Sequence, residues 1–290
     1  GQAAASGSRE GLRGLRVNTL KTEPEAFRKR FSSLLRPVPW TKNGFYIEGD
    51  QKASKHPYYA AGLYYLQEPS AMTPAAALPI EEGDRVLDLC AAPGGKSTEL
   101  AARLLGTGLL VANDISNSRA KALLKNLELF GAENILVTSE SPDRLCSYFE
   151  GFFDKILIDA PCSGEGMFRK EEAAVTDWSV ETVEMCARRQ REILESAAAM
   201  LRPGGRLVYS TCTFAPEENE CMAAWFVRTH PDFCLEDLSA LPFGRPGFVW
   251  EQVVPFAAGE IQPDVPLTRC RRLLPGDGGE GHFLALFREG

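Results

Sequence analysis

From residue 85 onward, short apolar runs alternate with longer segments in which apolar residues recur every three or four positions. Short runs of this kind are typical of buried strands, and the longer segments are typical of amphipathic helices. The pattern predicts strands at 85–90, 109–114, 134–139, 153–161 and 206–212. It predicts helices at 96–105, 118–131 with Gly131 as the stop, 179–202 with "RPGG" as the end, and 216–230. The later segments 247–254 and 281–289 also have the composition of strands.

Strands that alternate with helices predict a doubly wound, mostly parallel α/β sheet of the Rossmann-like kind. Residues 1–70 do not follow the alternation, so we expect a separate small α+β region there, followed by the main domain at 71–290. Ligands of such sheets bind at the carboxyl ends of the strands. The reactive side chains that fall at those ends are Cys90, Asp114, Asp159, Cys162 and Cys212.

The composition is that of an ordinary globular protein, with 44% hydrophobic and 24% charged residues among 290. No apolar run reaches the roughly 18 residues of a membrane span, and the N-terminus lacks a secretion signal, so we expect a cytoplasmic protein without membrane contact. The eight cysteines form no C-x-x-C pair and only three histidines are present. We therefore expect no metal site and no disulfide framework, and we interpret the cysteines as reduced thiols, most of them buried.

The charge distribution changes the first impression given by a net charge of −7. Residues 1–60 carry 11 basic and 5 acidic residues, whereas the remaining 230 carry 21 basic and 34 acidic residues. A basic N-terminal region on an otherwise acidic chain indicates a local surface that binds a polyanion. A run of charged residues that is simply solvated has the same composition. The same region combines cations that can bind phosphates with aromatic rings that either stack on unpaired bases or simply pack: Arg28, Lys29, Arg30, Arg36, Lys42, Lys52, Lys55, Phe31, Trp40, Phe45 and Tyr46.

The segment "DLCAAPGGKSTELA" (88–101) has the pattern of a strand, a glycine turn and the start of a helix. Gly94 and Gly95 allow the backbone to approach a ligand closely, and Asp114 ends the next strand, where a carboxylate can bind ribose hydroxyls. A phosphate-binding P-loop would need glycine at position 90, which is Cys90, and G-x-G-x-x-G is also absent. We therefore favour a cofactor of the adenosine type over a nucleoside triphosphate or a turn without a ligand.

Two cysteines follow predicted strands directly, in "DAPCSGEGMFRK" (159–170) and "YSTCTFAPEENE" (209–220). Structural thiols, a disulfide, a metal site and a nucleophile are the candidate explanations. Together with "LDLCAAPGGKSTELA" and "NDIS", these segments resemble the successive motifs of the Nop/Sun family of RNA cytosine-5 methyltransferases. An N-methylating enzyme would show Asn/Asp-Pro-Pro-aromatic in place of "DAPC".

The form "PCSGEGMFRK" is similar to the bacterial RsmF-like ribosomal RNA branch of that family, as are the flanking segments "LRVNTLK" (15–21), "NGFYIEG" (43–49), "HPYYAAGLYYLQEPSAM" (56–72) and "GEGHFLALFR" (279–288). The resemblance covers nearly the whole chain. It implies a methyltransferase fold, S-adenosylmethionine (SAM) as the cofactor and RNA as the partner, with small-subunit ribosomal RNA as the substrate. The alternatives are transfer RNA as the substrate and a non-catalytic RNA-binding module on the same fold.

The resemblance also implies roles for the two thiols. A cysteine thiolate that adds to carbon 6 of cytosine makes carbon 5 nucleophilic, and a second thiol can assist release of the product. By the Nop/Sun resemblance Cys212 is the nucleophile and Cys162 aids release, whereas DNA cytosine-5 methyltransferases would suggest the reverse. Asp159 would hydrogen-bond the base, and Lys96 would favour the thiolate of Cys212 electrostatically.

The cofactor contacts implied by the resemblance fall on Cys90, Ala91, Ala92, Pro93, Gly94, Gly95, Lys96, Asp114 and Asp159. Arg119 either orders the loop after Asp114 or is an ordinary helix-face arginine. Ser141 stands where the family has an aspartate for the adenine amino group, and Glu140 or Asp143 would then substitute for it. Arg169 and Lys170 are expected to contact RNA. We further expect a monomer that lacks the family's C-terminal RNA-binding domain, binds SAM and methylates RNA weakly by itself.

Overall fold

The computed structural model of the chain describes residues 12–31, 34–48, 52–164, 179–257 and 264–290. Within this part, the N-terminal residues form a small antiparallel sheet with strand order β2-β3-β1-β4. Its strands are β1 (Gly14–Val17), β2 (Leu35–Pro37), β3 (Gly44–Ile47) and β4 (Tyr64–Leu66). The short helices that accompany the sheet are α1 (Pro24–Arg30), η1 (Ala53–Lys55) and α2 (Pro57–Ala60).

A second, larger sheet follows, and its central strands β9, β8, β5, β6 and β7 are all parallel, as the alternation of strands and helices predicts. Strand β13 then pairs antiparallel with β9, and β10 and β12 pair antiparallel with β13. The strands are β5 (Arg85–Asp88), β6 (Leu109–Asn113), β7 (Ile135–Thr138), β8 (Phe153–Asp159), β9 (Leu201–Thr211), β10 (Phe233–Leu235), β11 (Arg245–Pro246), β12 (Arg271–Leu273) and β13 (His282–Glu289).

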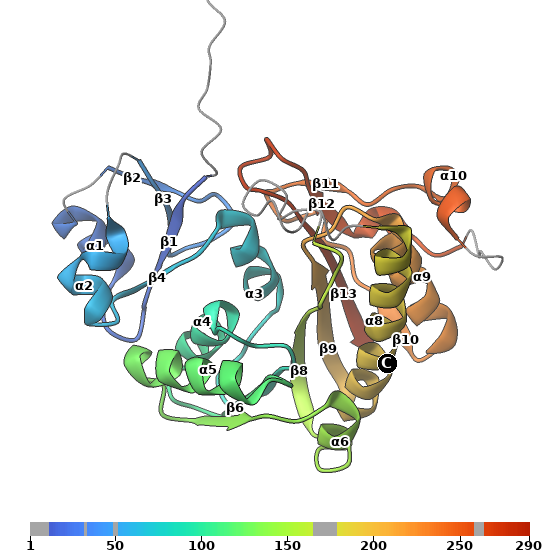
Figure 1. Ribbon diagram of the computed structural model, residues 1–290, viewed down its shortest axis with the longest axis horizontal. Helices are drawn as coiled ribbons and strands as arrows, with labels where there is room; N and C mark the ends of the chain where they lie inside the picture. The colour runs from blue at the N-terminus through green and yellow to red at the C-terminus, as the bar shows by residue number, and fades with distance from the viewer. Residues whose placement is uncertain (1–11, 32–33, 49–51, 165–178, 258–263) are drawn as a thin grey trace, which may run out of the picture.

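Helices cover both faces of the large sheet, because side chains alternate between the faces along each strand. In β5, Leu87 packs with α8 and α9 on one face, while Val86 packs with α3, α4 and α5 on the other. Figure 1 shows α8 and α9 on the side of the sheet away from α4 and α5. The helices are η2 (Pro69–Met72), α3 (Thr73–Ala77), α4 (Gly95–Leu104), α5 (Asn117–Phe130), α6 (Pro142–Cys146), α8 (Val180–Met200), η4 (Pro216–Glu218), α9 (Glu220–Thr229), α10 (Trp250–Val253), η5 (Val254–Phe256) and η6 (Leu267–Arg269).

Two predicted elements differ from the structure. The segment 247–254 contains the helix α10 and no strand; Trp250 and Val253 turn toward the core at helical spacing, and only Val253 is buried completely. The segment "RPGG" does not merely end the helix before it, because α8 ends at Met200 and β9 begins at Leu201. The pairing register between β8 and β9 shifts between Phe153 and Lys155, which accommodates the extra residues of "RPGG" within β9. Gly204 adopts the positive φ of +79° that this irregularity contains.

The four aromatic residues of the N-terminal region, for which stacking on RNA and ordinary packing were both open, are part of the core. Phe31 and Phe45 belong to the apolar cluster of the small sheet, and Trp40 and Tyr46 pack against the part of the chain built on the large sheet. All four are less than 10% exposed, so the packing interpretation is the correct one. The cations Lys29, Arg30, Arg36, Lys42, Lys52 and Lys55 lie on the surface, and Arg28 is partly buried.

Candidate active site

Cys162 and Cys212 follow β8 and β9, which are neighbouring parallel strands, and their Sγ atoms lie 3.1 Å apart. The contact with Cys212, together with burial and the nearby Glu218 carboxylate, raises the pKa of Cys162 well above its ordinary value. Cys162 therefore keeps its proton at neutral pH and can donate a hydrogen bond to Cys212. All eight cysteines are free thiols; contrary to expectation, only Cys186 and Cys270 are fully buried.

A buried carboxylate holds the two cysteine loops together. Glu218, in η4, accepts hydrogen bonds from the backbone N–H of Ser163 at 3.0 Å, the hydroxyl of Ser163 at 2.6 Å and the amide of Gln190 at 2.9 Å. Gln190, on α8, also donates to the carbonyl of Pro161 at 2.9 Å. Ser163 contacts Thr213 at 2.8 Å, so the residue after each cysteine is joined to the other loop.

Asp159, the last residue of β8, is surrounded by donors. Its Oδ2 pairs with Lys96 Nζ at 2.8 Å, and its Oδ1 accepts from Ser210 Oγ at 2.9 Å and lies 3.2 Å from His282 Nε2. Although burial opposes ionisation, Lys96 and His282 lower the pKa of Asp159. Burial alone would lower the pKa of Lys96, but Asp159, Asp88 and Cys212 raise it above its ordinary value. Lys96 therefore stays positively charged near Cys212.

The glycine loop runs from Cys90 to Lys96 and leads into α4. Gly94 has a φ of +119°, a conformation that favours glycine, and Asn126 of α5 donates to the carbonyl of Pro93 at 2.7 Å. The peptide bond between Ala92 and Pro93 is cis. Ala91 is buried, Cys90 and Ala92 are half-buried, and burial raises the pKa of Cys90. The thiol of Cys90 is therefore uncharged where it lies at the start of the loop.

Beneath this loop, Asp88 ends β5 and is completely buried. Its Oδ2 accepts from Ser97 Oγ at 2.6 Å, but its Oδ1 has no hydrogen-bond partner among the described residues. Burial raises the pKa of Asp88 to about 7. An orphaned carboxylate oxygen at the carboxyl end of a central strand is an acceptor for a ligand donor or for its own proton.

The next strand end carries Asp114, which is nearly buried and pairs through Oδ1 with Arg119 at 3.1 Å and with the backbone N–H of Ser116 at 3.0 Å. Of the two interpretations of Arg119, the structure therefore supports the one in which it orders this loop. Ser141 is the N-cap residue of α6, which follows β7. The side-chain amide of Asn113 donates to the backbone carbonyl of Glu140 at 3.0 Å and accepts from its backbone N–H at 3.0 Å. Ser141 and Glu140 thus lie at the same edge of the sheet as Asp114.

The structure brings Lys96, Asp159, Cys162 and Cys212 into one cluster at the carboxyl edge of the sheet, with the glycine loop beside it. Sequence reasoning missed Ser210, Glu218 and His282. Ser210 could have been found, since the predicted strand 206–212 places it two positions before Cys212 and therefore on the same face. Arg169 and Lys170 lie outside the described residues.

A groove of about 1000 Å³ lies between α8, α9 and α10, and it reaches Phe214, two residues after Cys212. Arginine and aromatic side chains contribute much of its lining, including Arg188, Arg191, Trp225 and Trp250. The guanidinium of Arg191 lies 5.5 Å from the centre of the Trp225 ring. Among the described residues, no group of three or more His, Cys, Asp or Glu side chains is arranged to hold a metal ion, and no helix is long and apolar enough to cross a membrane.

Comparison with known proteins gives two family matches. A family described as "16S rRNA methyltransferase RsmB/F" matches residues 75–288, and one described as "N-terminal domain of 16S rRNA methyltransferase RsmF" matches residues 2–69. Ribosomal RNA small subunit methyltransferase F of Citrobacter koseri is 43% identical over 241 residues, which are 80% of this chain and 50% of that protein. Its counterpart in Escherichia coli O81 is 43% identical over 230 residues, which are 76% and 48% of the two chains. The chain thus spans about half the length of these relatives.

Solved structures agree with the fold. A methyltransferase homologue from Pyrococcus horikoshii superposes with a TM-score of 0.85 at 32% identity, over 97% of this chain and 87% of that one. The structure of NSun6 from Pyrococcus horikoshii with SFG superposes with a TM-score of 0.80 at 22% identity, over 97% and 92% of the two chains. The large sheet and its helices therefore have the methyltransferase fold, which excludes the P-loop interpretation of the glycine loop.

Proposed function

Because the chain belongs to the RsmB/F family of 16S rRNA methyltransferases, we propose that it transfers a methyl group from SAM to carbon 5 of a cytosine in small-subunit ribosomal RNA. The observation that carries the proposal is the pair of thiols 3.1 Å apart at the ends of β8 and β9, with the Lys96–Asp159 ion pair beside them. A protein that only bound RNA would have no use for two apposed thiols next to a charged lysine.

Cys212 is the nucleophile in this proposal. Its thiolate adds to carbon 6 of cytosine, the electron pair of the carbon 5–carbon 6 double bond shifts toward carbon 4 and nitrogen 3, and carbon 5 becomes the nucleophilic carbon of an enamine. The ammonium group of Lys96 interacts electrostatically with Cys212, so it attracts the negative charge that the attacking sulfur carries. Asp159, ionised and held by Lys96 and Ser210, is the acceptor for a donor on the base.

Cys162 acts at the end of the reaction. After methylation a water molecule accepts the carbon-5 proton, the electron pair of that carbon–hydrogen bond re-forms the double bond, and the bond between carbon 6 and Cys212 breaks, which returns the thiolate. Cys162 retains its proton and lies within hydrogen-bond distance of Cys212 Sγ. In the proposal its S–H stabilises the departing thiolate, so Cys212 attacks and Cys162 assists release.

The residues at the carboxyl edge fit the cofactor. The carboxylate of Asp114 is suited to ribose hydroxyls, the loop Cys90–Lys96 offers backbone groups, and the orphaned Oδ1 of Asp88 is an acceptor beneath that loop. SAM supplies the electrophilic methyl group when bound. Ser141 and Glu140 are the candidates for the adenine edge, because both follow β7 at the same edge of the sheet.

The RNA is held, in this proposal, by the exposed cations of residues 1–70 and by the arginine- and aromatic-lined groove that begins at Phe214. Arginine and tryptophan are residue types that bind phosphates and stack on unpaired bases. The target cytosine must be unpaired or flipped out of its helix, because the thiolate approaches carbon 6 from above the ring.

The experiment is to trap the adduct. The protein and SAM are incubated with RNA that contains 5-fluorocytidine, whose fluorine blocks removal of the carbon-5 substituent, and the products are separated on a denaturing gel. We expect a crosslink that Cys212→Ala abolishes and Cys162→Ala retains. A crosslink lost only in Cys162→Ala would reverse the two roles. Absence of any crosslink, with SAM binding intact, would contradict attack on carbon 6.

A further inference from the structure

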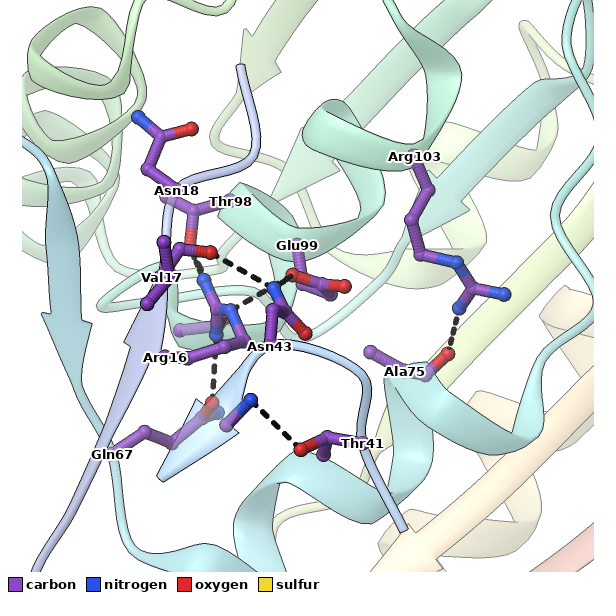
Figure 2. A network of polar contacts seen from close by, with 12 residues as sticks. Arg16, Val17, Asn18, Thr41, Asn43, Gln67, Ala75, Thr98, Glu99 and Arg103 are labelled. Carbon is purple, nitrogen blue, oxygen red and sulfur yellow. Dashed lines mark hydrogen bonds and ion pairs between the residues drawn. The ribbon is translucent and has the colours of Figure 1, made fainter. Parts of the chain in front are cut away.

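Arg16, in β1 of the small sheet, is completely buried. Its side chain reaches the start of α4, in the part of the chain built on the large sheet, which is called the catalytic part below. Its guanidinium donates to the carbonyl of Gly95 and to the hydroxyl of Thr98, and Nε lies 3.0 Å from a carboxylate oxygen of Glu99. A further N–H donates to Gln67 Oε1 at 2.7 Å. Figure 2 shows the guanidinium among Gln67, Thr98 and Glu99.

Neighbouring residues of the small sheet complete the junction. Asn43 donates to the backbone carbonyl of Val17 at 2.9 Å and to Glu99 at 3.0 Å, so it joins β1 to the same carboxylate. Gly95 has no room for a side chain, because a Cβ would lie 2.9 Å from Gln67 Nε2 and 3.1 Å from the Tyr65 ring. The glycine loop is therefore fitted against the small sheet as well as against the large one.

We propose that Arg16 is a positioning residue for the cofactor loop, so that the small N-terminal sheet is a structural part of the SAM site. Gly95 and Thr98 flank Lys96, and Lys96 pairs with Asp159 at 2.8 Å. A shift of the Gly95 carbonyl moves both the loop that faces the cofactor and the lysine beside the thiols. The proposal rests on the proposed function, since it assumes that this loop binds SAM.

Arginine is needed at this position because its planar fork contacts three acceptors on α4 and one on Gln67 at once. Lysine keeps the charge opposite Glu99 but has a single nitrogen that cannot reach all of these groups. The variant Arg16→Lys therefore separates the positioning contacts from the charge. Thr98→Val removes one of the acceptors and retains the shape of the side chain.

The matched control is Asn18, which is also buried in the small region and also binds the catalytic part. Its amide donates to the carbonyls of Gly62 at 2.8 Å and Phe130 at 2.9 Å, away from the glycine loop. Asn18→Ala therefore weakens the junction between the two parts without removing a contact to Gly95 or Thr98.

The test measures the dissociation constant of SAM by titration calorimetry, well below the unfolding temperature of each variant. We expect Arg16→Lys to bind SAM about tenfold more weakly, which is the scale of a lost charge-assisted hydrogen bond. Thr98→Val should bind several-fold more weakly, and Asn18→Ala should bind like the wild type although its melting temperature falls.

Equal binding by Arg16→Lys, Thr98→Val and the wild type would overturn the proposal, as would equal weakening by Asn18→Ala. A wild-type chain that does not bind SAM would instead contradict the proposed function. If Arg16→Lys does not fold, the comparison of Thr98→Val with Asn18→Ala gives the same decision.

Discussion

Glu218 joins the two cysteine loops through one buried carboxylate, and its removal would break three hydrogen bonds from Ser163 and Gln190. We expect Glu218→Ala to slow adduct formation with 5-fluorocytidine RNA at least about tenfold and to lower the free energy of unfolding by about 3 kcal/mol. Glu218→Gln should recover part of the rate of adduct formation and part of the free energy of unfolding, because the amide oxygen can still accept from the Ser163 N–H.

Glu236 provides the control for this prediction. It pairs with Arg206 at 3.2 Å and Arg288 at 3.0 Å, toward the other end of β9. Glu236→Ala should lower stability slightly and leave the rate of adduct formation unchanged. If both alanine variants slow the adduct in proportion to their loss of stability, Glu218 has no positioning role.

The raised pKa of Asp88 predicts that the free energy of unfolding depends on pH. Burial raises its pKa from near 4 to about 7, with Ser97 and Lys96 opposing the shift and Asp159 and Asp114 adding to it. Its contribution to stability is therefore complete below its ordinary pKa and is lost as the pH rises through about 7. Asp88→Asn is neutral at every pH, and its amide oxygen can still accept from Ser97.

We expect the melting temperature of Asp88→Asn to rise relative to the wild type between pH 5.5 and 8.5. Asp237 is exposed, and hydrogen bonds from Ser239 lower its pKa, so Asp237→Asn should show no such trend in this range. A difference between Asp88→Asn and the wild type that stays constant with pH would mean that Asp88 is already ionised at pH 5.5.

The catalytic cluster was predictable from sequence because parallel strands end at one edge of a sheet, so residues that follow such strands meet there. Asp159, Cys162 and Cys212 were found in this way, whereas Lys96 was found through the family resemblance. Glu218 and His282 were not, since their partners lie 55 and 123 positions away and only the folded chain brings them together. The aromatic residues of 1–60 were ambiguous for another reason: rings that pack and rings that stack have the same composition.

At the level of elements, α5 ends where the sequence predicted, at Gly131 with a φ of +81°. A Cβ on Gly131 would make only an ordinary contact with Lys21, at 3.5 Å, so the cost of Gly131→Ala comes from the left-handed backbone. We expect a loss of about 1 kcal/mol, or roughly 2–4 °C in melting temperature, with SAM binding retained. Asparagine tolerates this conformation better, so Gly131→Asn should lose less; an equal loss in both variants would contradict the backbone explanation.

The helix α10 shows why the short segments were harder to predict than the long ones. A run of eight residues rich in valine, phenylalanine and tryptophan fits a strand or a buried helical turn equally well. The folded chain decides: Trp250 donates to the carbonyl of Val265 at 3.1 Å, and within the segment the Gln252 side chain accepts from the backbone N–H of Val249. Val265 lies outside the segment, so this contact is not visible in the local pattern.

For the whole molecule, the charge asymmetry predicts where RNA is held. The net charge of −7 repels a polyanion, but screening confines that repulsion to about 10 Å, so the exposed cations of the N-terminal region act locally. Lys29 and Arg30 are exposed at the end of α1. Their replacement by glutamate should weaken RNA binding about equally for all sequences, because phosphate contacts carry no base information.

The salt dependence makes this prediction quantitative. Loss of two phosphate contacts to single-stranded RNA should reduce the slope of log K against log salt by about 1.4. Lys121 and Lys125 are exposed on α5 of the acidic catalytic part, and their replacement by glutamate changes the net charge by the same amount. Fluorescence anisotropy at several salt concentrations should show the smaller slope only for Lys29→Glu/Arg30→Glu. The same change in both double variants would mean that RNA responds to net charge, and that residues 1–70 provide no specific RNA surface.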